Sequence, residues 1–200
     1  MSPWIKICGI TTPEAVWVAQ GAGVDAIGFV FADSARRVTP VQARRLASGV
    51  RGRLACCAVI RGITQAELDE IVTVLQPDVL QVDVGELASL KLPRTLEVLP
   101  VANARRPAPD ILPERLLIER PPQDDDAGWD EAGLQRLARR TRLILAGGLD
   151  AENVGRIVRS VSPFGVDVSR GVETAPGIKH HDLIRRFVRA ARSLNGAISL

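Results

Sequence analysis

The sequence predicts an α/β protein whose parallel strands close into a (β/α)₈ barrel. Along 200 residues, eight short apolar segments alternate with about seven segments that carry helix signals. The apolar segments are continuous rather than alternating, as is typical of strands buried on both faces, and strands joined through helices run parallel. Eight such units close into a barrel. The alternative, a doubly wound open sheet, needs a glycine-rich turn after its first strand, where this chain has Cys8-Gly9-Ile10-Thr11.

Each predicted strand is a brief apolar run bounded by turn residues or by helix signals. The eight strands are expected at residues 4–7, 25–31, 54–60, 79–82, 95–101, 115–119, 142–146 and 164–168.

Helix starts are marked by hydroxyl or carboxylate caps. Thr12 precedes Pro13, Thr39 precedes Pro40, and Thr64 with Glu67 forms a capping box,. We also expect Asp150 to cap a helix. The predicted helices begin near residues 13, 40, 65, 85, 131, 151 and 181, and the one at 85–90 is short.

Two connections depart from a regular barrel unit. Residues 103–114 carry three prolines and no helical period, so the fifth helix is predicted to be missing or degenerate,. Residues 120–128 read as a long polar loop. In the last predicted helix, apolar residues recur on one face and should pack on the barrel: Leu183, Ile184, Phe187, Val188, Ala191 and Leu194,.

Bulk properties fit one domain over residues 1–200 and exclude several function classes. The net charge is only +3 and basic residues are scattered over predicted helices, while aromatic residues make up 4%. This composition indicates no nucleic-acid partner. No apolar run has the length of a membrane span, and no secretory signal is recognisable. Three cysteines, two of them adjacent, form no disulfide framework, which favours a reducing cytoplasm,.

Reactive groups of a barrel gather at the carboxyl ends of its strands. Those ends carry Cys8, residues 34–37, Asp83, Glu119, Gly147 with Gly148, and residues 167–171. Cys8 could equally be a buried packing residue, which is the interpretation we favour for Cys56 and Cys57.

Three kinds of chemistry follow from these positions. Cys8 and Glu119 would face each other across the barrel mouth as a base and an acid. Arg36 could hold a substrate carboxylate, although a surface arginine is the simpler interpretation. The loops after strands seven and eight are the usual phosphate site of a barrel, formed here by Gly147, Gly148, Ser169, Arg170 and Gly171. No metal cluster appears, and the two histidines precede the last helix,.

Together these segments resemble the phosphoribosylanthranilate isomerase family of tryptophan biosynthesis over most of the chain. The matching motifs occur in order along the sequence. They are Lys6-Ile-Cys-Gly-Ile-Thr11, Gly28-Phe-Val-Phe31 with Ser34-Ala-Arg-Arg-Val38, Leu145-Ala-Gly-Gly-Leu149 with Glu152-Asn-Val154, and Val166-Asp-Val-Ser-Arg-Gly-Val-Glu173 with Pro176-Gly-Ile-Lys179.

The resemblance implies an Amadori rearrangement of a small phosphorylated substrate, without cofactor or metal. It implies that Cys8 is the general base that removes the C2′ proton. It also implies that Arg36 meets the anthranilate carboxylate. The family's acid is an aspartate that closes strand six, a position taken here by Glu119. The oligomeric state is left open between a monomer and a homodimer.

This sequence differs from the family pattern at several places. The family's Gln-Leu-His-Gly is Gln81-Val82-Asp83-Val84-Gly85, and its Gly-Gly-Thr-Gly loop is replaced at 123–128. The second serine of the family's motif at strand eight is Arg170 here. An acid from Asp124 to Asp126 is an alternative to Glu119. A barrel that acts on another sugar phosphate, or only binds one, is the alternative function.

Overall fold

Eight parallel strands close into a barrel in the computed structural model, which describes residues 2–103, 108–120 and 129–193. Neighbouring strands pair in sequence order, and β8 pairs with β1 to complete the ring. The strands are β1 (Trp4–Cys8), β2 (Ala26–Val30), β3 (Ala55–Val59), β4 (Val79–Asp83), β5 (Glu97–Ala102), β6 (Arg115–Glu119), β7 (Arg142–Ala146) and β8 (Gly165–Val168). The closed barrel predicted from the sequence is therefore confirmed.

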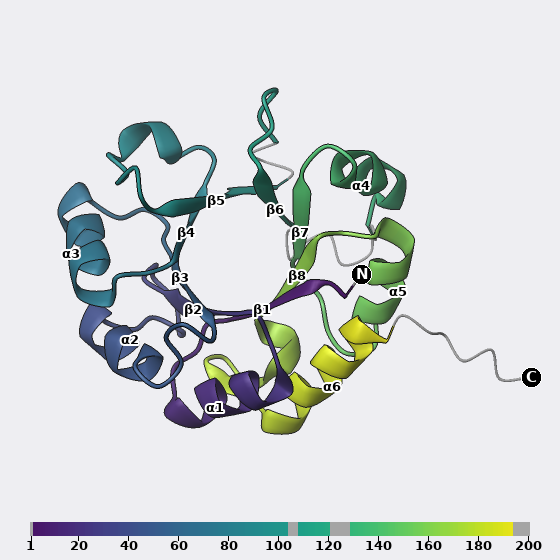
Figure 1. The fold of residues 1–200 in the computed structure, drawn as a ribbon, viewed down its shortest axis with the longest axis horizontal. Helices are drawn as coiled ribbons and strands as arrows, with labels where there is room; N and C mark the ends of the chain where they lie inside the picture. Colours follow the sequence, from purple (N-terminus) through teal and green to yellow (C-terminus); the bar gives the residue numbers. More distant parts are fainter. Residues whose placement is uncertain (1, 104–107, 121–128, 194–200) are drawn as a thin grey trace, which may run out of the picture.

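The helices form a ring outside the barrel (Figure 1). In the described residues these are α1 (Pro13–Ala22), α2 (Pro40–Ala47), α3 (Gln65–Leu75), α4 (Glu131–Ala138), α5 (Val154–Val161) and α6 (His181–Arg192). None of these helices is long and apolar enough to cross a membrane. The Thr12, Thr39 and Thr64 caps form as predicted, each accepting a hydrogen bond from a backbone N–H of the first turn.

Two predicted helix features were wrong. The helix expected at 85–90 is a single 3₁₀ turn, η1 (Leu87–Ser89). Asp150 does not cap α5 directly. Its carboxylate accepts hydrogen bonds from the N–H groups of Glu152 and Asn153, and the helix begins only at Val154. The side chain thus stabilises a turn before the helix, a conformation that aspartate favours as readily as a cap.

The connection between β5 and β6 is described only in part. Residues 108–114 contain no helix, and residues 104–107 lie outside the described residues, as do 121–128 of the predicted polar loop. Leu194 of the last helical face also lies outside them. Four other members of that face, Ile184, Phe187, Val188 and Ala191, are buried.

One structural feature was not predicted. After β8 the chain forms a 3₁₀ turn, η3 (Arg170–Val172), followed by a hairpin of β9 (Glu173–Ala175) and β10 (Ile178–Lys179). This hairpin brings Glu173 and Lys179 side by side near the mouth of the barrel.

Side chains along each strand alternate between two environments. Ile5 and Ile7 of β1 face the helices in the main apolar core, whereas Lys6 and Cys8 face the barrel interior. The interior holds a smaller apolar cluster: Ala26, Cys57, Val79, Leu99, Val101, Leu117, Ile144 and Ala146. At the amino ends of the strands, Phe164 stacks on Trp4 and lies under the guanidinium of Arg142 at 4.0 Å. These aromatic contacts cover the amino ends of the strands, and the cavity described below opens at their carboxyl ends.

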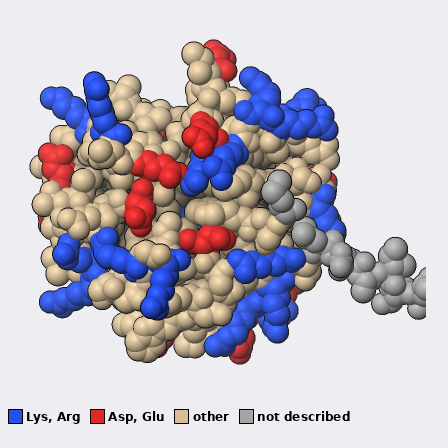
Figure 2. Space-filling view, viewed as in Figure 1, with Lys and Arg blue, Asp and Glu red and all other residues tan. Residues whose placement is uncertain are grey.

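The charges on one face of the molecule are dispersed. On the face that Figure 2 shows, basic side chains form separate clusters with acidic side chains between them. This distribution agrees with the scattered positions of basic residues in the sequence.

Candidate active site

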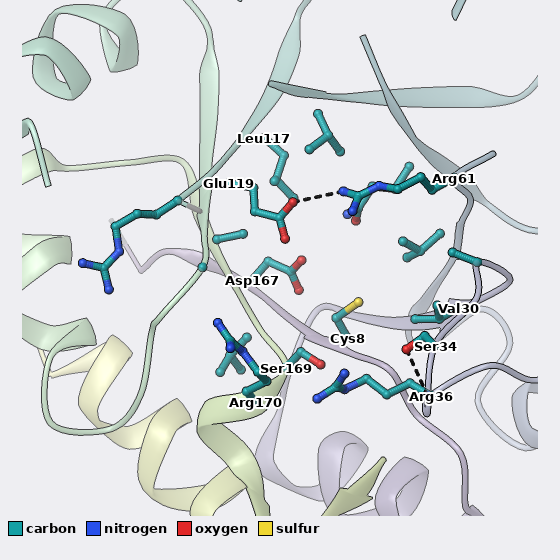
Figure 3. Close-up of a pocket in the computed structure, with 18 of the residues that line it drawn as sticks. Cys8, Val30, Ser34, Arg36, Arg61, Leu117, Glu119, Asp167, Ser169 and Arg170 are labelled. Atoms are coloured by element: carbon teal, nitrogen blue, oxygen red, sulfur yellow. Dashed lines mark hydrogen bonds and ion pairs between the residues drawn. The ribbon is translucent and has the colours of Figure 1, made fainter. Parts of the chain in front are cut away.

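A cavity of about 320 Å³ opens at the carboxyl ends of the strands. Its lining includes every site residue expected from the sequence: Cys8, Arg36, Glu119, Gly147, Gly148, Ser169, Arg170 and Gly171. Figure 3 shows Cys8, Glu119 and Asp167 directed into the same space from three different strands. The alternative acids Asp124 to Asp126 lie outside the described residues.

A buried ion pair lies inside the barrel next to Cys8. Lys6 and Asp167 are register partners on β1 and β8, and Lys6 Nζ donates a hydrogen bond to Asp167 Oδ2 at 2.9 Å. The Lys6 side chain has no exposed surface. Burial alone would lower the pKa of Lys6, but Asp167 and the thiols of Cys8 and Cys57 hold that pKa above its ordinary range. Lys6 is therefore a fixed cation inside the barrel.

Gly28 makes room for this lysine. A β-carbon at Gly28 would lie 3.0 Å from Lys6 Cε, 3.1 Å from Lys6 Nζ and 3.2 Å from the backbone of Cys8. Any larger residue on this part of β2 would press on both Lys6 and Cys8. Steric contact with Lys6 and Cys8 therefore explains why the second matching motif has a glycine at position 28.

The Cys8 thiol is nearly enclosed. Burial raises the pKa of Cys8, Lys6 and Lys179 offset part of that rise, and Asp167 adds to it. The protonated thiol is therefore the resting form, and added positive charge in the cavity would favour the thiolate.

Arg36 is held by a partner that the sequence did not indicate. Its Nε and Nη2 donate hydrogen bonds of 2.8 and 2.6 Å to the two carboxylate oxygens of Glu173. The Arg36 guanidinium points into the cavity from the loop after β2 (Figure 3). Glu173 engages Nε and Nη2, so among the described residues Nη1 is left for a ligand.

Lys179 completes this cluster. Its Nζ donates to Glu173 Oε1 at 2.7 Å and to the carbonyl and hydroxyl oxygens of Ser169 at 3.1 and 3.2 Å. Burial by itself would raise the pKa of Glu173, but Arg36 and Lys179 hold it below the usual value. Glu173 is thus an anion that orients two cations at the edge of the cavity.

Glu119 ends β6 and carries its carboxylate over the cavity. Arg61, from the loop after β3, donates to Glu119 Oε2 at 3.2 Å across the mouth (Figure 3). The two side chains are 58% and 42% exposed, so this ion pair is worth less than about 1 kcal/mol. Glu119 can exchange this partner for a ligand at small cost.

The loops after β6, β7 and β8 meet through glycines. Gly147 has φ +92°, and a β-carbon there would collide with the backbone of Arg120. A β-carbon at Gly171 would collide with the carbonyl of Leu149. These close approaches fix the geometry of the rim on which the phosphate site was predicted.

Comparison with known proteins identifies the family. The family model described as N-(5′-phosphoribosyl)anthranilate (PRA) isomerase matches residues 5–190. An N-(5′-phosphoribosyl)anthranilate isomerase of Mesorhizobium japonicum is 38% identical over 209 residues, which cover 94% of this chain and 95% of the relative. The chain belongs to this family. The PRA isomerase activity of tryptophan biosynthesis, predicted from the sequence, is thereby confirmed.

Solved structures of PRA isomerases share the fold. One holds monomers generated from the dimeric enzyme of Thermotoga maritima, with a TM-score of 0.77 and 27% identity, covering 97% of this chain and all of the other. A second, in complex with reduced 1-(o-carboxyphenylamino)-1-deoxyribulose 5-phosphate, gives a TM-score of 0.78 at 27% identity and the same coverage.

Against this family background, the structure adds residues to which the sequence analysis gave no role. These are Lys6, Asp167, Glu173, Lys179 and Arg61. Lys6 and Asp167 carried a signal, since each is a charged residue inside an otherwise apolar strand. Glu173 and Lys179 lay in the last of the four matching motifs, but only the hairpin reveals that Glu173 pairs with both Lys179 and Arg36.

Proposed function

We propose that this cavity is the catalytic site for the PRA isomerase reaction, with Cys8 as general base and Glu119 as general acid. The observation that carries the proposal is that one cavity gathers a thiol, a carboxylate, a guanidinium and two glycine-containing loops from five parts of the chain. These groups match the substrate, which has a reactive sugar between a carboxylate and a phosphate.

The acid acts first. The carboxylic acid form of Glu119 gives its proton to the ring oxygen, the C1′–O bond breaks, and the nitrogen lone pair forms the C=N bond of a Schiff base. The exposed Arg61 pair costs little to exchange,, so the Glu119 side chain is free to turn to the ring oxygen.

The base acts on the open chain. The Cys8 thiolate removes the proton from C2′, the electrons of the C–H bond form the C1′=C2′ bond, and the electrons of the C=N double bond return to nitrogen. The resulting enol then tautomerises to the ketone. The positive charge on the Schiff base favours the thiolate and acidifies C2′ at the same step. Lys6 supplies a permanent positive charge next to the sulfur.

The two ends of the substrate have separate partners. Arg36 meets the anthranilate carboxylate, and its bidentate pair with Glu173 keeps the guanidinium oriented. Gly147, Gly148, Ser169 and Gly171 form the phosphate site together with Arg170, whose exposed side chain on the rim adds positive charge,. We place the enzyme in the cytoplasm, in keeping with three free cysteines. Sedimentation analysis decides between a monomer and a homodimer.

Substitution of the two reacting groups tests the proposal. Cys8→Ser and Glu119→Gln should each lower kcat by about 10²- to 10⁴-fold, the usual share of general acid–base catalysis, and leave KM within a few-fold. Cys56→Ser is the matched control, because Cys56 is on the outer face of β3 in the main core. Only the control should restore growth of a tryptophan auxotroph. A Cys8→Ser enzyme that retains a tenth of kcat would refute the assignment.

A further inference from the structure

Two buried acceptor atoms in the cavity receive no hydrogen bond from the described residues. They are Oδ1 of Asp167 and Oε1 of Gln81. The two residues are 5% and 8% exposed and both line the cavity. They come from β8 and β4, which stand on opposite sides of the eight-stranded ring. Buried polar atoms are normally paired, so two such acceptors in one cavity point to a ligand that carries donors.

The type of ligand group follows from the chemistry of these atoms. Ionised phosphate and carboxylate groups accept hydrogen bonds and cannot donate to Asp167 or Gln81. A cation is disfavoured near Asp167, because Lys6 already neutralises that carboxylate at 2.9 Å. Neutral hydroxyl groups fulfil the requirement. In the substrate these are the hydroxyls of the sugar chain.

We propose that Asp167 and Gln81 recognise the sugar of the substrate, each accepting a hydrogen bond from a sugar hydroxyl. This inference rests on the proposed function, since it takes the cavity to be the substrate site. Asp167 lies between Cys8 and Glu119 in Figure 3, and its other oxygen is fixed by Lys6. A hydroxyl bound there would hold the sugar carbons between the base and the acid, with little loss of side-chain freedom on binding.

Inhibition by two phosphate esters tests this inference. Ribitol 5-phosphate and pentyl phosphate share the chain length and the phosphate and differ in hydroxyl groups. The wild-type enzyme should bind ribitol 5-phosphate more tightly. Gln81→Leu should reduce that preference about three- to tenfold and Asp167→Asn tenfold or more, because the second acceptor is charged. The affinity for pentyl phosphate should stay unchanged in both variants. Gln20→Leu, on α1 outside the barrel, should keep the wild-type ratio.

The outcomes separate this inference from the proposed function. One outcome is that both variants keep the wild-type preference for ribitol 5-phosphate while both esters still compete with substrate. That result would overturn hydroxyl recognition by Asp167 and Gln81 and would leave the proposed active site supported. If neither ester competes in the wild-type enzyme, both proposals fail. Should Asp167→Asn fail to fold because Lys6 loses its partner, the ratio measured for Gln81→Leu decides.

Discussion

The cluster of Glu173, Arg36 and Lys179 allows a stability prediction that can be worked out from the structure. The Glu173 side chain is 4% exposed and binds two cations, one of which, Lys179, is 1% exposed. In Glu173→Gln an amide NH₂ replaces one of the carboxylate oxygens and faces a donor. Both cations then lose their charge partner, and for the buried one, Lys179, this costs about 3–5 kcal/mol in comparable sites,. We expect about 3 kcal/mol, because Lys179 keeps its hydrogen bonds to Ser169.

Glu152→Gln is the matched control. Glu152 pairs with Arg186 at 2.8 Å, but its side chain is 66% exposed, so its loss should cost less than about 1 kcal/mol. In thermal unfolding, 3 kcal/mol corresponds to a Tm lower by roughly 6–12 °C for a domain of this size. Equal free energies of unfolding for the two variants would show that burial of this cluster does not determine its strength.

The pH dependence of the same comparison has a definite sign. Because the pKa of Glu173 is lowered in the folded protein, its contribution is present above the unfolded value, near 4.5, and is lost as the pH falls through the folded value. The difference between wild type and Glu173→Gln should therefore be full at pH 7 and shrink in acid below pH 4.5. A difference that stays constant down to pH 3 would contradict the assigned ionic state.

Two further predictions concern Gly28 and the cysteines. Gly28→Ala should lower the free energy of unfolding by about 1–3 kcal/mol in guanidinium titrations, because the added methyl group would press on Lys6 inside the barrel,. Gly21→Ala on α1 is the control. A β-carbon there meets no atom within 4 Å, so this substitution should be neutral or stabilising,. Iodoacetamide should modify Cys8 slowly at pH 7 and faster as pH rises, because burial raises the pKa of its thiol. Peptide mass mapping should find Cys56 and Cys57, whose pKa values burial raises to about 11 and 12, modified last.

Local sequence signals were sufficient for the elements of the barrel. The runs at 115–119 and 142–146 predict the bounds of β6 and β7 to the residue. The capping box at Thr64 and Glu67 marks the first turn of α3. These succeed because a cap and a continuous apolar run depend on neighbours within four residues. The prediction that Asp150 caps a helix failed for the same local reason, because an aspartate carboxylate stabilises a turn as well as it stabilises a helix start,.

The residues of the candidate site could be predicted only as far as strand ends show them. Parallel strands expose their carboxyl ends at one edge, so Cys8, Glu119 and the glycine loops could be expected around one cavity. Their motifs also indicated the family. The barrel, the family and the position of the chemistry could therefore all be predicted without the structure.

The pairing of the buried charges could not be predicted, because it depends on how the barrel closes. Lys6 and Asp167 are 161 residues apart and meet because β8 closes the ring beside β1 in one register. Arg36 and Glu173 are 137 residues apart and meet through a hairpin that no local pattern announced. Ion pairs depend on distance in space and on burial, and both arise only when the barrel has closed.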